Sequence, residues 1–99
     1  MQIDPRFLGE WRQVDPDPAP AAIFVTFEAD GRLQYRLETA TVQIILLTWR
    51  VEGGLLVTEQ PGGSREERSA FRFPTSTRLV LEKLGETFSY DRSGDAAGA

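Results

Sequence analysis

Apolar and polar residues alternate with a period of two along most of the chain. The clearest stretch is residues 32–39, where Leu33, Tyr35 and Leu37 alternate with charged and polar side chains. Successive side chains of a β-strand point to opposite faces, whereas an amphipathic helix repeats every 3.6 residues. The pattern therefore predicts β-strands, at residues 9–14, 22–28, 32–39, 41–51, 55–60, 67–73, 78–83 and 86–92.

Short, glycine-rich turns separate these strands. Asp30-Gly31 predicts a two-residue type I′ hairpin, which requires a positive φ at both positions, and Gly53-Gly54 and Gly85 predict two further turns. Such connections leave no room for crossover helices, so neighbouring strands pair antiparallel. Because closure removes exposed sheet edges, we expect an all-β fold: an antiparallel up-and-down meander of seven or eight short strands that forms a small barrel.

The two ends of the chain depart from this pattern. Asp4 is a typical N-cap and Pro5 suits the first position of a helix, so we expect one helical turn that caps an end of the barrel through Phe7 and Leu8. The chain of 99 residues suits a single domain, which we expect over residues 1–92. Residues 93–99 lack apolar anchors and predict a flexible C-terminal tail.

Residues 41–51 are apolar on both faces. A barrel strand needs apolar side chains only on its inward face, so the outward row requires some other cover. The outward row consists of Val42, Ile44 and Leu46. If the chain dimerises, this row is the candidate dimer face, and Leu55 and Val57 are candidates for extending it. The facing of residues 55–60 stays open, because Leu55 and Leu56 compete for the inward position.

Composition and charge exclude several classes of function. Fifteen acidic residues against eleven basic ones give a net charge of −4, which disfavours binding to nucleic acid or to an anionic membrane. Without cysteine there is no disulfide, and no oxidising compartment is implied. The N-terminus lacks the basic and apolar regions of a secretory signal, and the longest apolar-rich run, residues 39–49, is too short to span a membrane. We expect a cytoplasmic protein.

Catalytic and metal-binding chemistry has little support in the sequence. The chain lacks histidine as well as cysteine, which removes the usual general base, the thiolate nucleophile and the commonest metal ligands. Glu66 and Glu67 are adjacent where the predicted strand 67–73 begins. Adjacent residues of an extended chain point to opposite faces, so the two carboxylates cannot act on one bond. We therefore expect no enzymatic activity, no cofactor and no metal. Arginines and glutamates alternate along the strands, which predicts cross-strand ion pairs rather than a basic stripe.

Gly9, Trp11 and Arg92 are candidates for closing the barrel. Gly9 lets the backbone approach a neighbouring strand closely, and Trp11 supplies a large apolar ring. If the last strand lies beside the first, the Arg92 guanidinium can stack on the Trp11 ring and donate to nearby carbonyl groups. The alternative is that Trp11 is an ordinary core residue and Arg92 an ordinary surface residue.

Together these features resemble the lipocalin-like proteins of the calycin group, in particular their small bacterial members. The resemblance rests on Gly9-x-Trp11, on the Asp-Gly and Gly-Gly hairpins, on residues 49–56 and on the closing Tyr90-x-Arg92, and it covers roughly residues 8–92. It implies an up-and-down barrel whose closed end carries Trp11 and Arg92, with a cavity that in larger relatives holds an apolar small molecule. The strands predicted here average about six or seven residues and are shorter than those of larger lipocalins. In such a small barrel the inward aromatic side chains can fill the interior.

Two functions follow. In the first, the barrel is a non-catalytic binding module that holds a small apolar or aromatic molecule. The residues expected to line this ligand site are Val25, Phe27, Tyr35, Leu37, Ile45, Trp49, Phe71, Phe73 and Tyr90. In the second, the barrel is filled, and the chain is a structural or interaction protein that forms a homodimer through Val42, Ile44 and Leu46. A dimer that also carries a ligand would satisfy both.

Overall fold

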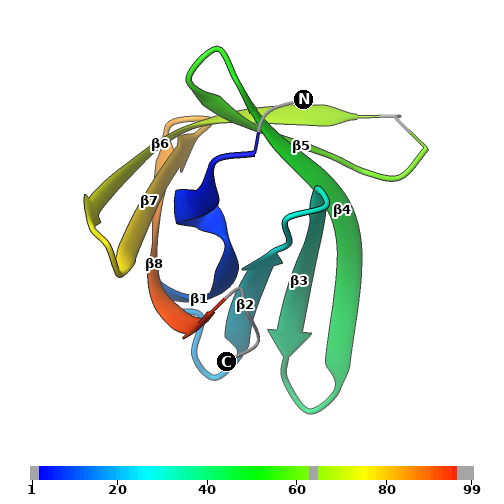
Figure 1. Cartoon of the computed structure of the whole chain (residues 1–99). Coiled ribbons are helices and arrows are strands. Elements are labelled where there is room, and N and C mark those ends of the chain that lie inside the picture. Colours follow the sequence, from blue (N-terminus) through cyan, green and yellow to red (C-terminus); the bar gives the residue numbers. More distant parts are fainter. Residues whose placement is uncertain (1–2, 63–64, 96–99) are drawn as a thin grey trace.

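Eight antiparallel strands pair in chain order and close into a barrel, with β8 returning to β1 (Figure 1). The structure is a computed structural model, and it describes residues 3–62 and 65–95. The elements are η1 (Pro5–Phe7), a 3₁₀ turn, and the strands β1 (Gly9–Asp15), β2 (Ala22–Phe27), β3 (Arg32–Glu38), β4 (Val42–Glu52), β5 (Leu55–Glu59), β6 (Glu66–Thr75), β7 (Arg78–Lys83) and β8 (Glu86–Asp95). The all-β meander predicted from the alternating pattern is confirmed.

The η1 turn plugs one end of the barrel. The Asp4 carboxylate accepts a hydrogen bond from the Arg6 backbone N–H (3.0 Å), and the Phe7 N–H donates to the Asp4 carbonyl (3.1 Å). This is the cap that aspartate followed by proline predicts. The turn directs the Phe7 ring into the barrel, where it has no exposed surface. In Figure 1 the N-terminal segment, in blue, runs inside the ring of strands.

Aromatic rings fill the plugged end. The centroid of the Phe7 ring lies 4.9 Å from that of Phe71 and 5.0 Å from that of Phe73. The rings of Phe27 and Trp49 lie at 5.0 and 5.4 Å from Phe7. These are tilted and edge-on pairs, the arrangements that aromatic rings prefer. The buried core continues around them through Trp11, Val25, Leu33, Leu56, Leu79, Leu81 and Tyr90.

Trp11 and Arg92 lie directly opposite each other where β1 meets β8. The Arg92 guanidinium carbon is 4.2 Å from the centroid of the Trp11 ring. Its Nη1 donates to the Leu8 carbonyl (2.6 Å) and its Nη2 to the Arg6 carbonyl (2.9 Å). Gly9 adopts a φ of +117°, which glycine tolerates and other residues rarely do. The last strand, β8, is thereby tied to the η1 plug.

The turn at Asp30-Gly31, between β2 and β3, differs from its prediction. A four-residue turn, Glu28–Gly31, joins β2 to β3, and the Gly31 N–H donates to the Glu28 carbonyl (3.1 Å). Gly31 has a φ of +91°, but Asp30 has no positive φ, so the type I′ prediction was wrong. The glycine alone supplies the left-handed conformation, because the longer turn does not demand it of the aspartate.

The C-terminal strand is longer than predicted. Residues 93–95, expected in the flexible tail, belong to β8, and Gly94 pairs with Glu10 of β1. The Ser93 hydroxyl donates to the Glu10 carboxylate (2.9 Å). The rest of the predicted tail, residues 96–99, lies outside the described residues. Backbone pairing and this polar contact extend the strand where the sequence offers no apolar anchor.

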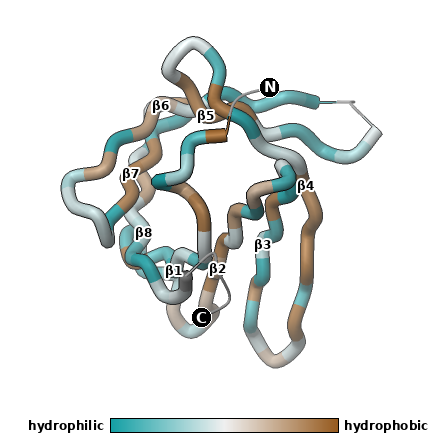
Figure 2. The backbone as a smooth tube through the Cα atoms, viewed as in Figure 1, coloured by the Kyte–Doolittle hydropathy of each residue, from teal (hydrophilic) through white to brown (hydrophobic). Residues whose placement is uncertain are grey.

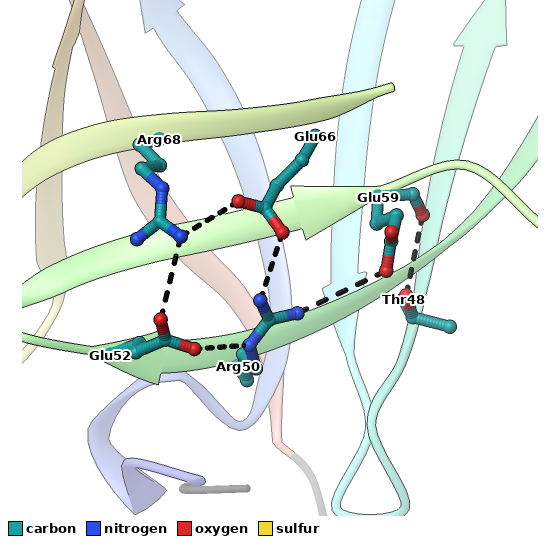
Figure 3. A network of polar contacts seen from close by, with 6 residues as sticks. All are labelled: Thr48, Arg50, Glu52, Glu59, Glu66 and Arg68. Carbon is teal, nitrogen blue, oxygen red and sulfur yellow. Dashed lines mark hydrogen bonds and ion pairs between the residues drawn. The ribbon is translucent and has the colours of Figure 1, made fainter. Parts of the chain in front are cut away.

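Charged side chains form a network on the outer face of β4, β5 and β6 (Figure 3). Arg50 contacts Glu52 (2.8 Å) and Glu66 (2.9 Å), and Arg68 contacts Glu66 (2.8 Å) and Glu52 (3.4 Å). The register places Val57 between the two arginines on this face, and Val57 is 0% exposed. The predicted cross-strand ion pairs are therefore present here. The expectation that Val57 extends an outer dimer face was wrong, because Val57 has no exposed surface. Its neighbours in the register are Arg50 and Arg68, whose apolar stems can cover it.

Candidate ligand site at the open end of the barrel

The end of the barrel away from η1 is hollow. Two adjoining hollows of about 290 Å³ each share Tyr35, Ile45 and Lys83 among their lining residues. These volumes lie at the lower end of the range for small-molecule sites. The first hollow is lined further by Leu47, Thr58, Glu59, Gln60, Arg65 and Glu67, and the second by Gln13, Ile23, Arg36, Leu37, Phe88 and Tyr90. We call the two hollows together the open-end site.

The inward face of β4 changes from core to accessible wall along the strand. Ile45 and Trp49 belong to the same inward row, since side chains two residues apart share a face. Trp49 is 1% exposed, in the plugged end, whereas Ile45 is 49% exposed. Ile45 lines both hollows. The aromatic filling therefore stops partway along the barrel, and an inward apolar side chain is left in contact with solvent.

Tyr35 on β3 and Tyr90 on β8 are the only tyrosines of the chain, and both line the open-end site. Burial raises the pKa of Tyr90 above its ordinary value, and the Tyr35 hydroxyl raises it further by charge and by hydrogen bonding. Burial also raises the pKa of Tyr35, and the negative charge of Glu67 adds to this. Both tyrosines are therefore neutral at physiological pH and offer hydroxyl groups rather than charges.

Tyr35 and Tyr90 influence each other's pKa, so their hydroxyl groups lie close together in the site. A tyrosine hydroxyl can both donate and accept a hydrogen bond. The pair therefore offers a ligand a neutral polar group beside the apolar wall of Ile45.

Glu67 and Lys83 form an ion pair at the rim. The Lys83 Nζ lies 3.7 Å from a carboxylate oxygen of Glu67, and it lies 5.5 Å from the centroid of the Phe88 ring. The two residues come from β6 and β7, neighbouring strands of the barrel. Because the pair is neutral as a whole, it adds polarity to the rim without a net charge.

The residues predicted to line the ligand site fall into two groups. Four of them line the open-end site: Tyr35, Leu37, Ile45 and Tyr90. The other five belong to the buried core or pack against it and do not line this site: Val25, Phe27, Trp49, Phe71 and Phe73. The reason is Phe7, whose ring is inserted among the aromatic side chains instead of lying over the end of the barrel.

The polar lining residues were not among the predicted site residues, although the period-two pattern contains a signal for some of them. Lys83 follows Leu79 and Leu81 on the inward row of β7, and Glu67 precedes Ser69 on the inward row of β6. A charged residue that continues an inward row at the end of a strand marks the mouth of a barrel. Gln13 is nearly buried, and its Nε2 donates to the Pro16 carbonyl (2.8 Å).

In the part of the chain that the structure describes, no helix is long and apolar enough to cross a membrane. The cytoplasmic location stays a prediction.

Of the resemblance to lipocalin-like proteins, the structure supports the architecture, which is a closed barrel of eight antiparallel strands. Comparison with protein-family models, with curated proteins and with solved structures finds no match to this chain.

Proposed function

We propose that this protein is a non-catalytic binding module of lipocalin-like type, which holds a small apolar or aromatic molecule in the open-end site. The observation that carries the proposal is the exposure of Ile45, an inward side chain of the barrel that is 49% exposed beside the buried Tyr90 and the partly buried Tyr35. Covering apolar surface is favourable by roughly 25 cal/mol per Å². The apolar body of a ligand would supply that cover.

The ligand expected from the lining residues is uncharged and carries one hydrogen-bond acceptor. Leu37, Leu47 and Phe88 supply apolar walls. A tyrosine hydroxyl can donate a hydrogen bond, so Tyr35 and Tyr90 suit a carbonyl or hydroxyl oxygen of a ligand. A carboxylate ligand would have to compete with Glu67 for Lys83 and would leave one acidic group without its partner. We therefore expect ketones or alcohols to bind more tightly than acids of the same size.

The alternative function, an interaction protein with a filled barrel, is favoured by the exposed outer row of β4. Val42, Ile44 and Leu46 are 55–60% exposed. The filled barrel that this alternative assumes fits less well, because the aromatic packing around Phe7 does not extend to Ile45. Dimerisation and ligand binding remain compatible, since the outer row and the inward row of β4 point to opposite faces.

Ligand binding can be tested by following backbone amide NMR signals while adding matched pairs of small molecules. Acetophenone and a medium-chain methyl ketone serve as neutral probes, and benzoate and the corresponding fatty acid as charged ones. We expect saturable shifts that concentrate at Leu37, Thr58 and Phe88, with tighter binding of the neutral probes. Tryptophan fluorescence is a poor reporter here, because Trp49 and Trp11 lie at the plugged end.

Two variants of one strand provide the control. Phe88 lines the site, whereas its neighbour Thr87 points to the outer face and is exposed. Phe88→Gln should weaken binding of the ketones, and Thr87→Gln should leave it unchanged. The absence of saturable shifts in the wild-type chain across all four probes would overturn the proposed function. Equal binding by both variants would place the ligand elsewhere.

A further inference from the structure

One part of β4 has a free edge. β3 pairs with β4 from Val42 to Thr48, but β5 pairs with it only from Thr48 to Glu52. Among the described residues, no strand pairs with the β5 side of residues 42–47. We call this segment the β4 edge. It belongs to the β3–β4 hairpin at the lower right of Figure 1.

The register determines which backbone groups face the free side. The Trp49 N–H donates to the Gly31 carbonyl, and the Thr39 N–H donates to the Thr41 carbonyl, so odd-numbered residues of β4 exchange hydrogen bonds with the β3 side. Alternate residues of an antiparallel strand bond to opposite neighbours. The N–H and C=O groups of the even-numbered residues therefore point to the free side. These residues are Val42, Ile44 and Leu46.

The same three residues carry exposed apolar side chains, at 59%, 55% and 60% exposure in chain order. Figure 2 colours most of this part of β4 as hydrophobic. Natural sheets protect exposed edges with lysine, proline, bulges or very short strands. The β4 edge, Val-Gln-Ile-Ile-Leu-Leu, has no charged residue and no proline, and the β3–β4 register is regular throughout. An edge of this kind is suited to pairing with another strand.

We propose that the β4 edge pairs antiparallel with the β4 edge of a second copy of this chain, so that β3 and β4 of the two copies form one continuous sheet. The proposal differs from packing of the outer row face to face, because backbone hydrogen bonds hold the two strands together. It does not depend on the open-end site, and it would hold for a barrel that binds no ligand.

The β4 edge is complementary to itself. When a two-fold axis passes beside Ile44, that residue lies opposite Ile44 of the second copy, and Val42 lies opposite Leu46. Every free N–H and C=O group of the three residues then finds a partner, and the outer faces bring only apolar side chains together. The strand of the second copy cannot shift along β4 as far as Thr48, because Glu59 of β5 already pairs with Thr48.

Pairing at this edge would also complete a wall of the open-end site. Ile45 and Leu47 line the first hollow from β4, and Glu59 and Glu67 line it from β5 and β6. The strand of the second copy would lie along the β4 side of this opening. In the two-fold register it places Gln43 of the second copy beside Ile45, on the inward face. The second copy thus adds a polar residue to the rim.

The chain has no cysteine, so single cysteine variants report the register without interference. Residues paired through hydrogen bonds in an antiparallel ladder have Cα atoms about 5.5 Å apart, which suits a disulfide. Ile44→Cys should therefore form a disulfide-linked dimer under mild oxidation. We expect its rate to exceed that of Leu84→Cys by on the order of a hundredfold, because pairing raises the effective concentration of the thiols. Leu84 is 95% exposed but lies in the β7–β8 turn.

Val42→Cys tests the register itself. In the proposed dimer the two Val42 residues are offset by four positions, about 13 Å, which is beyond the reach of a disulfide. Rapid cross-linking of Ile44→Cys alone supports the proposal. Equal rates for Val42→Cys and Ile44→Cys would indicate packing of the outer faces or another register, and would overturn it. Equal rates for Ile44→Cys and Leu84→Cys would show random collision.

A second pair of variants separates edge pairing from apolar packing without any cross-link. Ile44→Pro removes one N–H on the free side and leaves the ladder to β3 intact, whereas Ile44→Thr keeps the N–H and removes apolar surface. In analytical ultracentrifugation we expect the wild-type chain and Ile44→Thr to dimerise and Ile44→Pro to stay monomeric, with unchanged circular dichroism. A wild-type monomer at high protein concentration would overturn the proposal, whatever the outcome of the ligand experiments.

Discussion

The guanidinium of Arg92 covers the face of Trp11 and leaves that ring with no exposed surface. The same guanidinium donates to the carbonyl groups of Leu8 and Arg6, two residues that flank the inserted Phe7. The last strand therefore fixes both the ring that closes the core and the turn that plugs the barrel. A planar group with several donors is needed for both contacts at once.

Arg92→Lys should lower the free energy of unfolding by about 1–3 kcal/mol, because lysine keeps the charge but cannot stack and donate to two carbonyl groups in the same geometry. Unfolding in urea, followed by tryptophan fluorescence, measures this loss. Arg12→Lys is the matched control, since Arg12 is exposed on β1 beside the same strand pair. A similar loss in both variants would contradict the role assigned to Arg92.

Phe7→Ala should destabilise the barrel by about 3–5 kcal/mol, because it leaves a cavity among four aromatic rings. Phe24→Ala is the control: Phe24 lies on the outer face of β2, under the Arg36 guanidinium, and should cost less. If the cavity stays open, benzene should raise the melting temperature of Phe7→Ala and not that of the wild-type chain. An unchanged stability of Phe7→Ala would mean that η1 does not plug the barrel.

The strands could be predicted from the sequence because period-two alternation is a local property. The row of Leu33, Tyr35 and Leu37 specifies its own face, whatever the neighbouring strands do. The contact between Trp11 and Arg92 was also predictable, since a closed meander must bring its first and last strands together. Predicting that contact required only the topology of the barrel.

The position of the ligand site was harder to predict, because it depends on how far side chains reach within the barrel. Nothing in the residues around Phe7 indicates whether its ring lies over the barrel end or enters it. Ile45 and Trp49 share one inward row, yet only the placement of Phe7 makes one accessible and the other buried. The free β4 edge depends on the unequal lengths of β4 and β5. β5 ends at Glu59, one residue before its predicted end, so its pairing with β4 stops at Thr48.

Alkaline titration should show that neither tyrosine ionises at the ordinary pKa of about 10 while the barrel is folded. The folded-state pKa values of Tyr35 and Tyr90 are raised, so their contribution to stability is fully present below pH 10 and is lost as the pH rises further. The near-ultraviolet absorbance of tyrosinate should therefore appear together with the loss of the β-sheet signal in circular dichroism. Tyr35→Phe should preserve this coincidence, because burial still protects Tyr90. Ionisation of both tyrosines near pH 10 with an intact barrel would contradict their raised pKa values.

The ion-pair network on the outer face should stabilise the barrel in the opposite pH range. Hydrogen bonds from Arg50 are the main cause that lowers the pKa values of Glu52 and Glu66 in the folded chain. The stabilisation is present above the unfolded pKa of about 4.3 and is lost as the pH falls through the lower folded values. Glu66→Gln should therefore lower the melting temperature slightly at neutral pH, and the difference from wild type should vanish in acid and shrink in high salt.

Glu82→Gln is the control for this experiment, because Glu82 is exposed on the outward row of β7 and makes none of the ion pairs of the network. It should leave the melting temperature unchanged at both pH values. If Glu66→Gln behaves like Glu82→Gln at neutral pH and low salt, the network adds nothing to stability. In that case the cover over Val57 comes from the apolar stems of Arg50 and Arg68 alone, and shortening those stems by Arg→Ala substitution should destabilise the barrel at every pH.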